Sequence, residues 1–559
     1  MFLNNVAGSF SRQLRSDTDS SRAMNTGRLG EREVAATQAK APPRIEHLRG
    51  EERVSLPEFS KPTPVYTRSI HTLYALQRNR IDAAALALGR LEGDPTVLKH
   101  LSHQLEAVNF KEDRPATRHE IARVKDLNKD LQMFIAKHLE RLGLPAKEAK
   151  HEAKVQMRQA SQDTLNNKVW NKIETNLAHK GEHYTCLLVP AAQMKREGYG
   201  IFPVPYGEHG VCSSSTKNIT HATNLWTSEI RGKDSEGRDV LLFRGVRHGI
   251  LSPYGLESGS VERVEGAINR AREVVAAALF ARPDLLEMAL AGKEVPLRVL
   301  SSSLVTGGLW KEKAMLNDQM RAWSTLSQEQ PLTLSLMGQD GKQQDVRIKL
   351  EVAAFNFGVN ELALKFHLGL RQSDGYNEVA LHQLLGKDLS VGMAPGGWVG
   401  EYLAGIPSPG NADRVLQLSH QLQSIWANKT HHHDGGEPYK AAQRATMLAF
   451  EIGAVPCWNC KSGKDRTGML DAEIKREAVR WHQHKVPSIP GGPLTKEDQT
   501  LLQQILLRGG NAEIQTYNTG APGNKVMNNM PAMNLSYHQR VGDDDVWLQT
   551  QGFSGLVKS

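Results

Sequence analysis

The chain has 559 residues, of which 39% are hydrophobic and 23% charged, and its formal net charge is +8. A chain of this length is too long to fold around one ordinary hydrophobic core, so two or three folded units are expected. Its net positive charge favours acidic partners such as nucleic acid, anionic membrane or phosphorylated substrates. The four cysteines exclude a disulfide framework and suit a reducing compartment, and no apolar run approaches the roughly 18 residues of a membrane span.

Residues 1–65 form a leader rich in Ser, Arg, Asn and Pro. This composition predicts extended or disordered chain. The first residues lack the basic start and apolar stretch of a Sec-type signal. An ordinary tail and a recognition segment are both open interpretations.

Residues 66–178 carry helical patterns. Asp94-Pro95 predicts a helix start, and Thr117 with Glu120 forms a capping box that opens a second helix. Apolar residues follow both signals at helical spacing. The pattern favours a small helical bundle, with a partner-binding face as the alternative use of the apolar stripes.

Residues 179–559 change to a mixed pattern. Two alternating runs flank Asp340-Gly341 within 331–352, which predicts a hairpin. Strands are also expected at 238–246 and 296–305, and helices at 261–281 and 438–452. The stretch 517–529 is polar and is expected to be irregular. The fold class is therefore α+β or α/β, a small N-terminal helical bundle followed by a mixed domain.

The segment CWNCKSGKDRTG, residues 457–468, is the most informative motif. A redox Cys-x-x-Cys pair gives no role to the lysines, glycines and arginine that follow it. A zinc site lacks a second cysteine pair. A nucleotide-binding loop needs Ser or Thr after Gly463-Lys464, where Asp465 stands. These three interpretations are disfavoured.

A fourth interpretation, a nucleophilic cysteine inside a phosphate-binding loop, gives a role to every part of the segment. An apolar, strand-like lead precedes Cys460, and a helical pattern follows Arg466. A tight loop between strand and helix presents backbone N–H groups to an anion and lowers the pKa of a cysteine within it. Cys460 is then the nucleophile, Arg466 binds the phosphate oxygens, and Thr467 assists the departing sulfur.

The remaining loop residues are Lys461, Ser462, Gly463 and Lys464, which we expect to contact substrate. Gly463 allows close approach of the backbone. One phosphate is already served by Arg466 and the loop backbone, so two further cations predict a substrate with several phosphates. The alternative is a pair of solvated loop lysines.

The loop resembles the Cys-Lys-Ser-x-Lys-Asp-Arg-Thr form of inositol polyphosphate 4-phosphatases. Further stretches resemble the SopB/SigD and IpgD family of bacterial type III-secreted phosphoinositide phosphatases, and the similarity covers nearly all of the chain from about residue 65. These stretches are AAFNFGVNELALK (353–365), PGGWVGEYLA (395–404), HHHDGGEPYKAAQR (431–444) and GNKVMNN (523–529).

The resemblance implies a virulence effector that a bacterium secretes into a host cell, where it dephosphorylates phosphoinositides and inositol polyphosphates in the cytoplasm and at anionic membrane. It further implies a helical domain, 66–178, that binds a host Rho-family GTPase, a leader that binds a secretion chaperone, and a phosphatase domain at 179–559. No cofactor, metal or nucleic acid is expected.

Asn356, Asn360 and Lys365 lie in the first of these stretches. They are expected either to position the inositol ring or to brace the active-site loop. The resemblance also makes Asp465 a candidate acid for the leaving inositol oxygen, which would require hydrogen-bond reach to that oxygen. An ion pair with a neighbouring lysine is the rival role.

Three other sequence features resemble functional motifs only weakly or allow a structural role. Arg247-His248-Gly249 imitates the start of a histidine phosphatase but lacks the usual residues that follow. His431–His433 is interpreted as a solvated loop, because adjacent histidines do not readily face one metal ion. Cys457 is either a packing residue or a disulfide partner that shields Cys460 from oxidation.

Two rival functions stay open at this point. A transferase would pass the phosphate from the same phosphocysteine to a neighbouring ring hydroxyl. A GTPase-binding scaffold would use its second domain only to hold anionic membrane. Cys460, Arg466 and Thr467, all present, favour an enzyme.

Overall fold

The computed structural model describes residues 67–106, 113–196, 198–308, 310–338, 340–358, 369–433, 436–484, 486–527 and 537–557. Its larger compact unit comprises residues 65–135 and 153–559 and holds the whole candidate site, while the smaller unit includes residues 136–152. No helix in the described ranges has both the length and the apolar character needed to cross a membrane.

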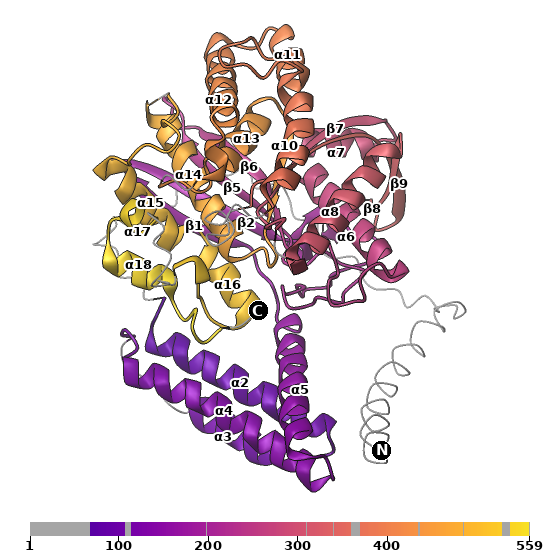
Figure 1. Cartoon of the computed structure of the whole chain (residues 1–559), viewed down its shortest axis with the longest axis vertical. Helices are drawn as coiled ribbons and strands as arrows, with labels where there is room; N and C mark the ends of the chain where they lie inside the picture. The colour runs from indigo at the N-terminus through magenta and orange to yellow at the C-terminus, as the bar shows by residue number, and fades with distance from the viewer. Residues whose placement is uncertain are drawn as a thin grey trace. The chain divides into compact units, whose positions relative to one another are not determined.

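A mixed sheet organises the larger unit (Figure 1). It has eight strands in the order β1-β2-β5-β6-β10-β7-β9-β8. Strands β6, β10, β7 and β9 run parallel, and antiparallel neighbours flank them on both sides. A separate pair is formed by β3 and β4. The strands are β1 Ile173–His179, β2 Glu182–Pro190, β3 Lys195–Arg196, β4 Tyr199–Gly200, β5 Trp226–Lys233, β6 Asp239–His248, β7 Val295–Ser303, β8 Leu332–Met337, β9 Gln343–Asn356 and β10 Val455–Asn459.

The helices are α2 Ile70–Arg90, α3 Thr96–Glu106, α4 Arg118–Arg141, α5 Ala146–Asn166, α6 Val261–Phe280, α7 Pro283–Leu290, α8 Trp310–Gln328, α10 Leu370–Leu385, α11 Gly397–Ala404, α12 Pro409–Ala427, α13 Lys440–Glu451, α14 Asp465–His484, α15 Lys496–Arg508, α16 Asn511–Thr519, α17 Tyr537–Val541 and α18 Asp544–Gln551. Short 3₁₀ turns occupy Ala191–Gln193, Thr430–His432 and Lys525–Met527.

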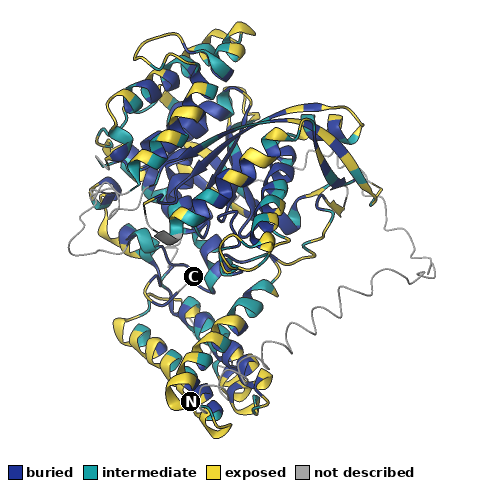
Figure 2. Ribbon diagram, turned by 45° about the vertical axis from the view of Figure 1, so that its right-hand side comes forward, coloured by how far each residue is buried: buried dark blue, intermediate teal, exposed yellow. Residues whose placement is uncertain are grey.

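The sheet separates two hydrophobic clusters, and β10 contributes to both. Trp458 packs with residues of α10 to α15, whereas Val455 and Cys457 pack with residues of α6, α7 and α8. This alternation follows from the two-residue period of a strand. All five residues of β10 are buried, as expected for a central parallel strand; Figure 2 shows the sheet as largely buried.

Several sequence predictions are confirmed. The hairpin pairs Leu332 with Ile348 across β8 and β9. In the capping box, Thr117 N donates to Glu120 Oε2 at 2.8 Å and Glu120 N donates to Thr117 Oγ1 at 3.2 Å. The mixed α/β class also agrees with the structure. The expectation of an irregular 517–529 stretch was wrong at its start, because Tyr517–Thr519 complete α16.

Helix α2 packs against a segment distant in sequence. Ile70, Leu73 and Leu76 are buried in one cluster with Ala521, Phe553, Leu556 and Val557. Arg80 adds hydrogen bonds to the carbonyls of Val124 and Leu556. The apolar face of α2 is thus covered by residues of α4 and of the C-terminal region.

Candidate active site

The loop after Asn459 connects the end of β10 to the start of α14 at Asp465. Gly463 has φ +64°, and a Cβ there would lie 2.6 Å from the carbonyl oxygen of His248. Only glycine fits this position without a backbone shift. The strand–loop–helix arrangement predicted for this segment is therefore present.

Cys460 is 2% exposed at the base of this loop. Burial alone would raise its pKa, but the charge of Arg466 and the nearby polar groups of Thr467 outweigh burial and hold the pKa of Cys460 below its ordinary value. Ser462 Oγ lies 3.9 Å from the sulfur. Such a thiol supplies the nucleophilic thiolate at lower pH than a free cysteine.

Arg466 is held on two sides. Its Nη1 donates to the Leu304 carbonyl at 2.8 Å and lies 3.4 Å from Glu312 Oε2, and its Nη2 donates to Glu312 Oε1 at 3.0 Å. Glu312 also accepts a hydrogen bond from Thr306 N at 2.8 Å. This fork geometry fixes the guanidinium plane beside Cys460.

The backbone of the loop presents unused donors. Within the described ranges, the N–H groups of Ser462, Gly463 and Lys464 donate to no other group of the chain. Three N–H groups in succession beside a helix N-terminus form an anion-binding site. Buried donors normally find partners, so the loop is built for a ligand that supplies acceptors.

The two loop lysines differ in their surroundings. Lys464 is 1% exposed, and its Nζ has no hydrogen-bond partner among the described residues. Lys461 is half-buried, with its Nζ 4.8 Å from the centroid of the Tyr254 ring. An unpaired buried ammonium is costly, which indicates an anionic partner for Lys464. The alternative of a solvated loop charge does not describe Lys464.

Known proteins resemble this chain over most of its length. The model of the family described as "Enterobacterial virulence protein IpgD" matches residues 26–557. The chain belongs to the IpgD family. It is 50% identical over 497 residues to the inositol phosphate phosphatase SopB of Salmonella typhi, covering 88% of this chain and 87% of that protein.

A second IpgD-family relative is the inositol phosphate phosphatase IpgD of Shigella flexneri, which is 40% identical over 489 residues, covering 86% of this chain and 87% of that protein. In fold, the chain is similar to a solved Legionella phosphoinositide phosphatase, with a TM-score of 0.57 and 10% identity over 87% of this chain and 90% of that one. The resemblance inferred from the motifs is therefore confirmed at the level of family.

Asp465, the first residue of α14, makes no ion pair within the part of the chain that the structure describes, and its Oδ1 has no hydrogen-bond partner there. The rival role, an ion pair with a neighbouring lysine, is thus not seen. A carboxyl group with an unused oxygen at the loop suits proton transfer to a leaving group.

Asn356 is 1% exposed and all its polar groups bind the protein. Its Nδ2 donates to the carbonyls of Ser303 and Val305 at 3.1 and 2.7 Å, and its Oδ1 accepts from Ser373 Oγ at 2.5 Å. These contacts brace the segment around Leu304, which binds Arg466, and they favour the bracing role over substrate contact. Asn360 and Lys365 lie outside the described residues.

The interpretation of His431–His433 as a solvated loop was wrong for the first two residues. The side chains of His431 and His432 are 4% and 10% exposed, and both place Nε2 2.9 Å from Asp374 Oδ1. The three residues form a group that could hold a metal ion. However, Lys429 Nζ also lies 3.4 Å from Asp374 Oδ2, so this carboxylate has a cationic partner in the structure. Asp374 belongs to α10, and no spacing pattern connects it to the two histidines.

Two further motif residues are buried beside the loop. Cys457 belongs to the cluster on the α6–α8 face of the sheet, and burial raises the pKa of its thiol; both features favour packing over disulfide exchange. His248 is fully buried, and burial lowers its pKa to about 4.

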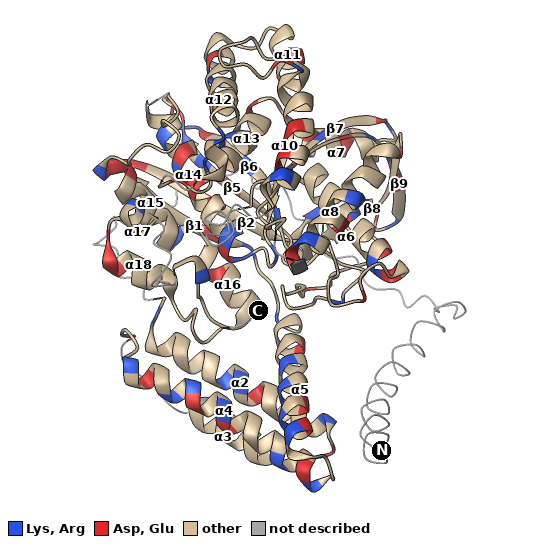
Figure 3. Cartoon of the chain, viewed as in Figure 1, with Lys and Arg blue, Asp and Glu red and all other residues tan. Residues whose placement is uncertain are grey.

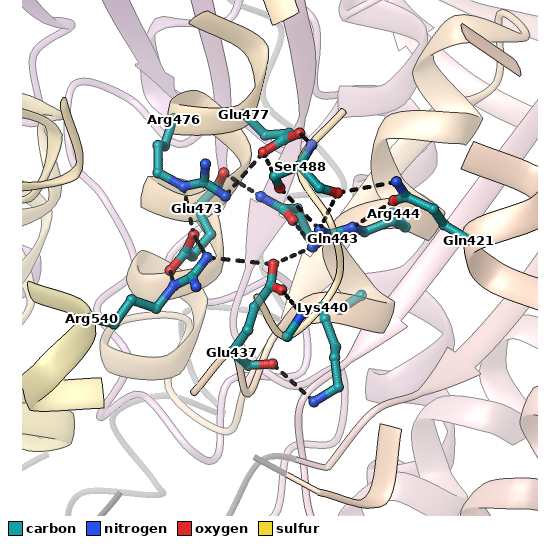
Figure 4. A network of polar contacts seen from close by, with 12 residues as sticks. Gln421, Glu437, Lys440, Gln443, Arg444, Glu473, Arg476, Glu477, Ser488 and Arg540 are labelled. Carbon is teal, nitrogen blue, oxygen red and sulfur yellow. Dashed lines mark hydrogen bonds and ion pairs between the residues drawn. The ribbon is translucent and has the colours of Figure 1, made fainter. Parts of the chain in front are cut away.

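Helix α14 is fixed by a buried network of charges (Figure 4). Glu473 accepts from Arg540 Nε at 2.6 Å and from Arg476 Nε at 3.0 Å. Glu437 pairs with Arg444 and lies 3.5 Å from Arg540 Nη2. The network joins α13, α14 and α17, and so holds the helix whose first turn carries Arg466.

Sequence reasoning missed Glu312 and Tyr254. Glu312 lies in the first turn of α8 and Tyr254 in the segment after β6. Neither belongs to a recognisable spacing with Cys460. The only available signal was that a partly buried Arg466 needs an anionic partner, since charges removed from water require partners.

Proposed function

We propose that this chain is a secreted virulence effector that hydrolyses phosphate esters of phosphoinositides and inositol polyphosphates through a phosphocysteine intermediate at Cys460. The observation that carries the proposal is the lowered pKa of Cys460 within a loop of unused N–H donors, beside Arg466. The inositol phosphate phosphatases SopB and IpgD are its relatives at 50% and 40% identity, which supports the substrate class.

In the first step, Cys460 Sγ attacks phosphorus and the bond from phosphorus to the inositol oxygen breaks. Asp465 gives its proton to that oxygen, while Arg466 and the loop N–H groups bind the three remaining phosphate oxygens. In the second step, water attacks phosphorus, Asp465 takes up a proton and the sulfur leaves as thiolate. Thr467 stabilises that thiolate, because its polar groups are among the causes of the lowered pKa of Cys460.

The substrate carries more than one phosphate in this proposal. Lys464 has no partner in the described structure and Lys461 lies at the Tyr254 ring, so both ammonium groups are available to additional phosphates. The steps use side chains and backbone of this chain alone and include no metal or cofactor.

We also propose three partners for this chain: a host GTPase, a secretion chaperone and anionic host membrane. The helical domain, 66–178, binds a host Rho-family GTPase, the leader binds a chaperone before type III secretion, and the effector acts in host cytoplasm and at anionic host membrane. Lys and Arg alternate with Asp and Glu along α4 and α5 (Figure 3), so these two helices present no continuous basic stripe of the kind that binds nucleic acid.

A panel of phosphoinositides, with products resolved by ring position, tests the activity. Hydrolysis requires one free phosphate for each ester lost, and Cys460→Ser must release none. Ring isomers formed without free phosphate would identify a transferase. If wild type and Cys460→Ser both bind a Rho-family GTPase and neither releases phosphate, the chain would be a GTPase-binding scaffold and not an enzyme.

A further inference from the structure

The loop carbonyls are held by groups from outside the loop. Asn224 Nδ2 donates to the carbonyl oxygen of Ser462 at 3.1 Å and to that of Gly463 at 2.8 Å. Arg247 Nη2 also donates to the Gly463 oxygen, at 3.3 Å. The preceding carbonyl, that of Lys461, accepts from Ile250 N at 3.2 Å. Three successive acceptors are therefore bound on their outer side.

This arrangement determines where the N–H groups point. In a trans peptide, the C=O of one residue and the N–H of the next lie on opposite sides. Holding the carbonyls of residues 461–463 from outside therefore directs the N–H groups of residues 462–464 away from Asn224. These are the N–H groups that donate to nothing else in the described chain.

Asn224 is itself fixed in orientation. It is fully buried with φ +51°, a left-handed conformation that Asn tolerates better than most residues. Its Oδ1 accepts from Trp226 Nε1 at 2.8 Å and from Asn518 Nδ2 at 2.7 Å. With two donors on its oxygen and two acceptors on its nitrogen, the amide has one favourable orientation.

We propose that Asn224 is a positioning residue of the anion site: by turning the Ser462 and Gly463 carbonyls outward, it directs loop N–H groups at a tetrahedral oxyanion and at the Cys460 thiolate. The proposal rests on the proposed function for its relevance to turnover. The same N–H groups stabilise the thiolate before any substrate binds, so the role is measurable without turnover.

Two variants test it: Asn224→Asp keeps the shape but places an acceptor against the carbonyls, and Asn224→Gly keeps the left-handed backbone without a side chain. The pH dependence of Cys460 alkylation by iodoacetamide is measured, with Cys460→Ser as the blank. Both variants should move the midpoint toward that of a free thiol and weaken orthovanadate binding at least ten-fold, as expected for lost oxyanion donors.

Asn166→Asp is the matched control, because Asn166 Nδ2 also donates a hydrogen bond, to Ser215 Oγ at 2.9 Å, which Asp cannot donate, but Asn166 does not touch the loop. It should lower the melting temperature without moving the alkylation midpoint. Folded Asn224 variants with the wild-type midpoint and vanadate affinity would overturn the proposal. If wild type releases no phosphate from any phosphoinositide, the proposed function fails, while the alkylation and vanadate measurements still decide the role of Asn224.

Discussion

Glu312 contacts both terminal nitrogens of Arg466, with Oε1 3.0 Å from Nη2 and Oε2 3.4 Å from Nη1. Its carboxylate also accepts a hydrogen bond from the backbone N–H of Thr306. Burial alone would raise the pKa of Glu312, but the charge of Arg466 and its hydrogen bonds lower it. Glu312 is therefore an anion at neutral pH. Its contacts orient the guanidinium of Arg466 beside Cys460.

Glu312→Gln is expected to reduce kcat more than it raises KM, because Arg466 would lose the charge that orients it. Hydrogen bonds to charged groups contribute about 1.5–3 kcal/mol, which corresponds to a loss of roughly ten- to a hundred-fold in kcat/KM. Steady-state kinetics on a soluble inositol polyphosphate measures the loss. An unchanged kcat in a folded variant would show that Leu304 alone orients Arg466.

Cys460→Ser is expected to abolish turnover while leaving the fold intact, because an alcohol is far less ionised than a thiol at neutral pH. Cys457→Ser should retain most of the rate, since Cys457 lies in the cluster on the α6–α8 face of the sheet. Phosphate release and melting temperature are measured for both. Reversed phenotypes would move the nucleophile to Cys457, and strong inhibition of wild type by EDTA would point to a metal mechanism.

Lys464→Met is expected to make the ligand-free protein more stable and less active. The substitution removes a buried ammonium without a partner in the described structure, and replacing buried ion pairs by apolar side chains of similar volume has raised stability by about 1–4 kcal/mol in other proteins. The loss in kcat/KM should be larger on bis- and trisphosphorylated inositol lipids than on p-nitrophenyl phosphate.

Lys461→Ala is the companion variant, because Lys461 is half-buried and contacts Tyr254. It should show the same substrate dependence without the gain in stability. Equal losses on both substrates would mean that the lysines tune the Cys460 thiolate. No loss on either would remove the evidence for a substrate with several phosphates.

The network around α14 predicts a pH dependence of stability. Burial alone would raise the pKa of Glu473, but Arg540 and Arg476 lower it well below its ordinary value. A folded pKa below the unfolded one, about 4.3, contributes stability that is present above the unfolded pKa and lost as pH falls toward the folded pKa. The free energy of unfolding should therefore fall as pH drops below about 5.

Glu473→Gln tests this directly, and urea unfolding at several pH values measures it. At pH 7 the variant should be less stable by about 3–5 kcal/mol, because buried arginines lose their counter-charge. The deficit should narrow at low pH. Asp126→Asn is the control, since Asp126 pairs with Lys129 on the surface, where ion pairs contribute little to stability. A deficit independent of pH would contradict the ion-pair explanation.

Local signals and distant partners explain what the sequence could and could not predict. The segment around Cys460 was predictable because strand, loop and helix are contiguous, and the hairpin around Asp340-Gly341 was predictable for the same reason. Glu312 and Asn224 reach the loop from positions more than a hundred residues earlier, and no spacing rule connects them to it. His431 and His432 were misjudged because their partner, Asp374, lies 57 and 58 positions away.

The packing of α2 on the C-terminal region has a consequence for the order of folding. Arg80 and Leu556 are 476 positions apart, and closing so long a stretch of chain is entropically unfavourable until the intervening sheet has brought its ends together. The apolar face of α2 is therefore expected to pack against residues 553–557 late in folding. In native-state hydrogen exchange, α2 and residues 553–557 should open together as one cooperative unit while β10 stays protected.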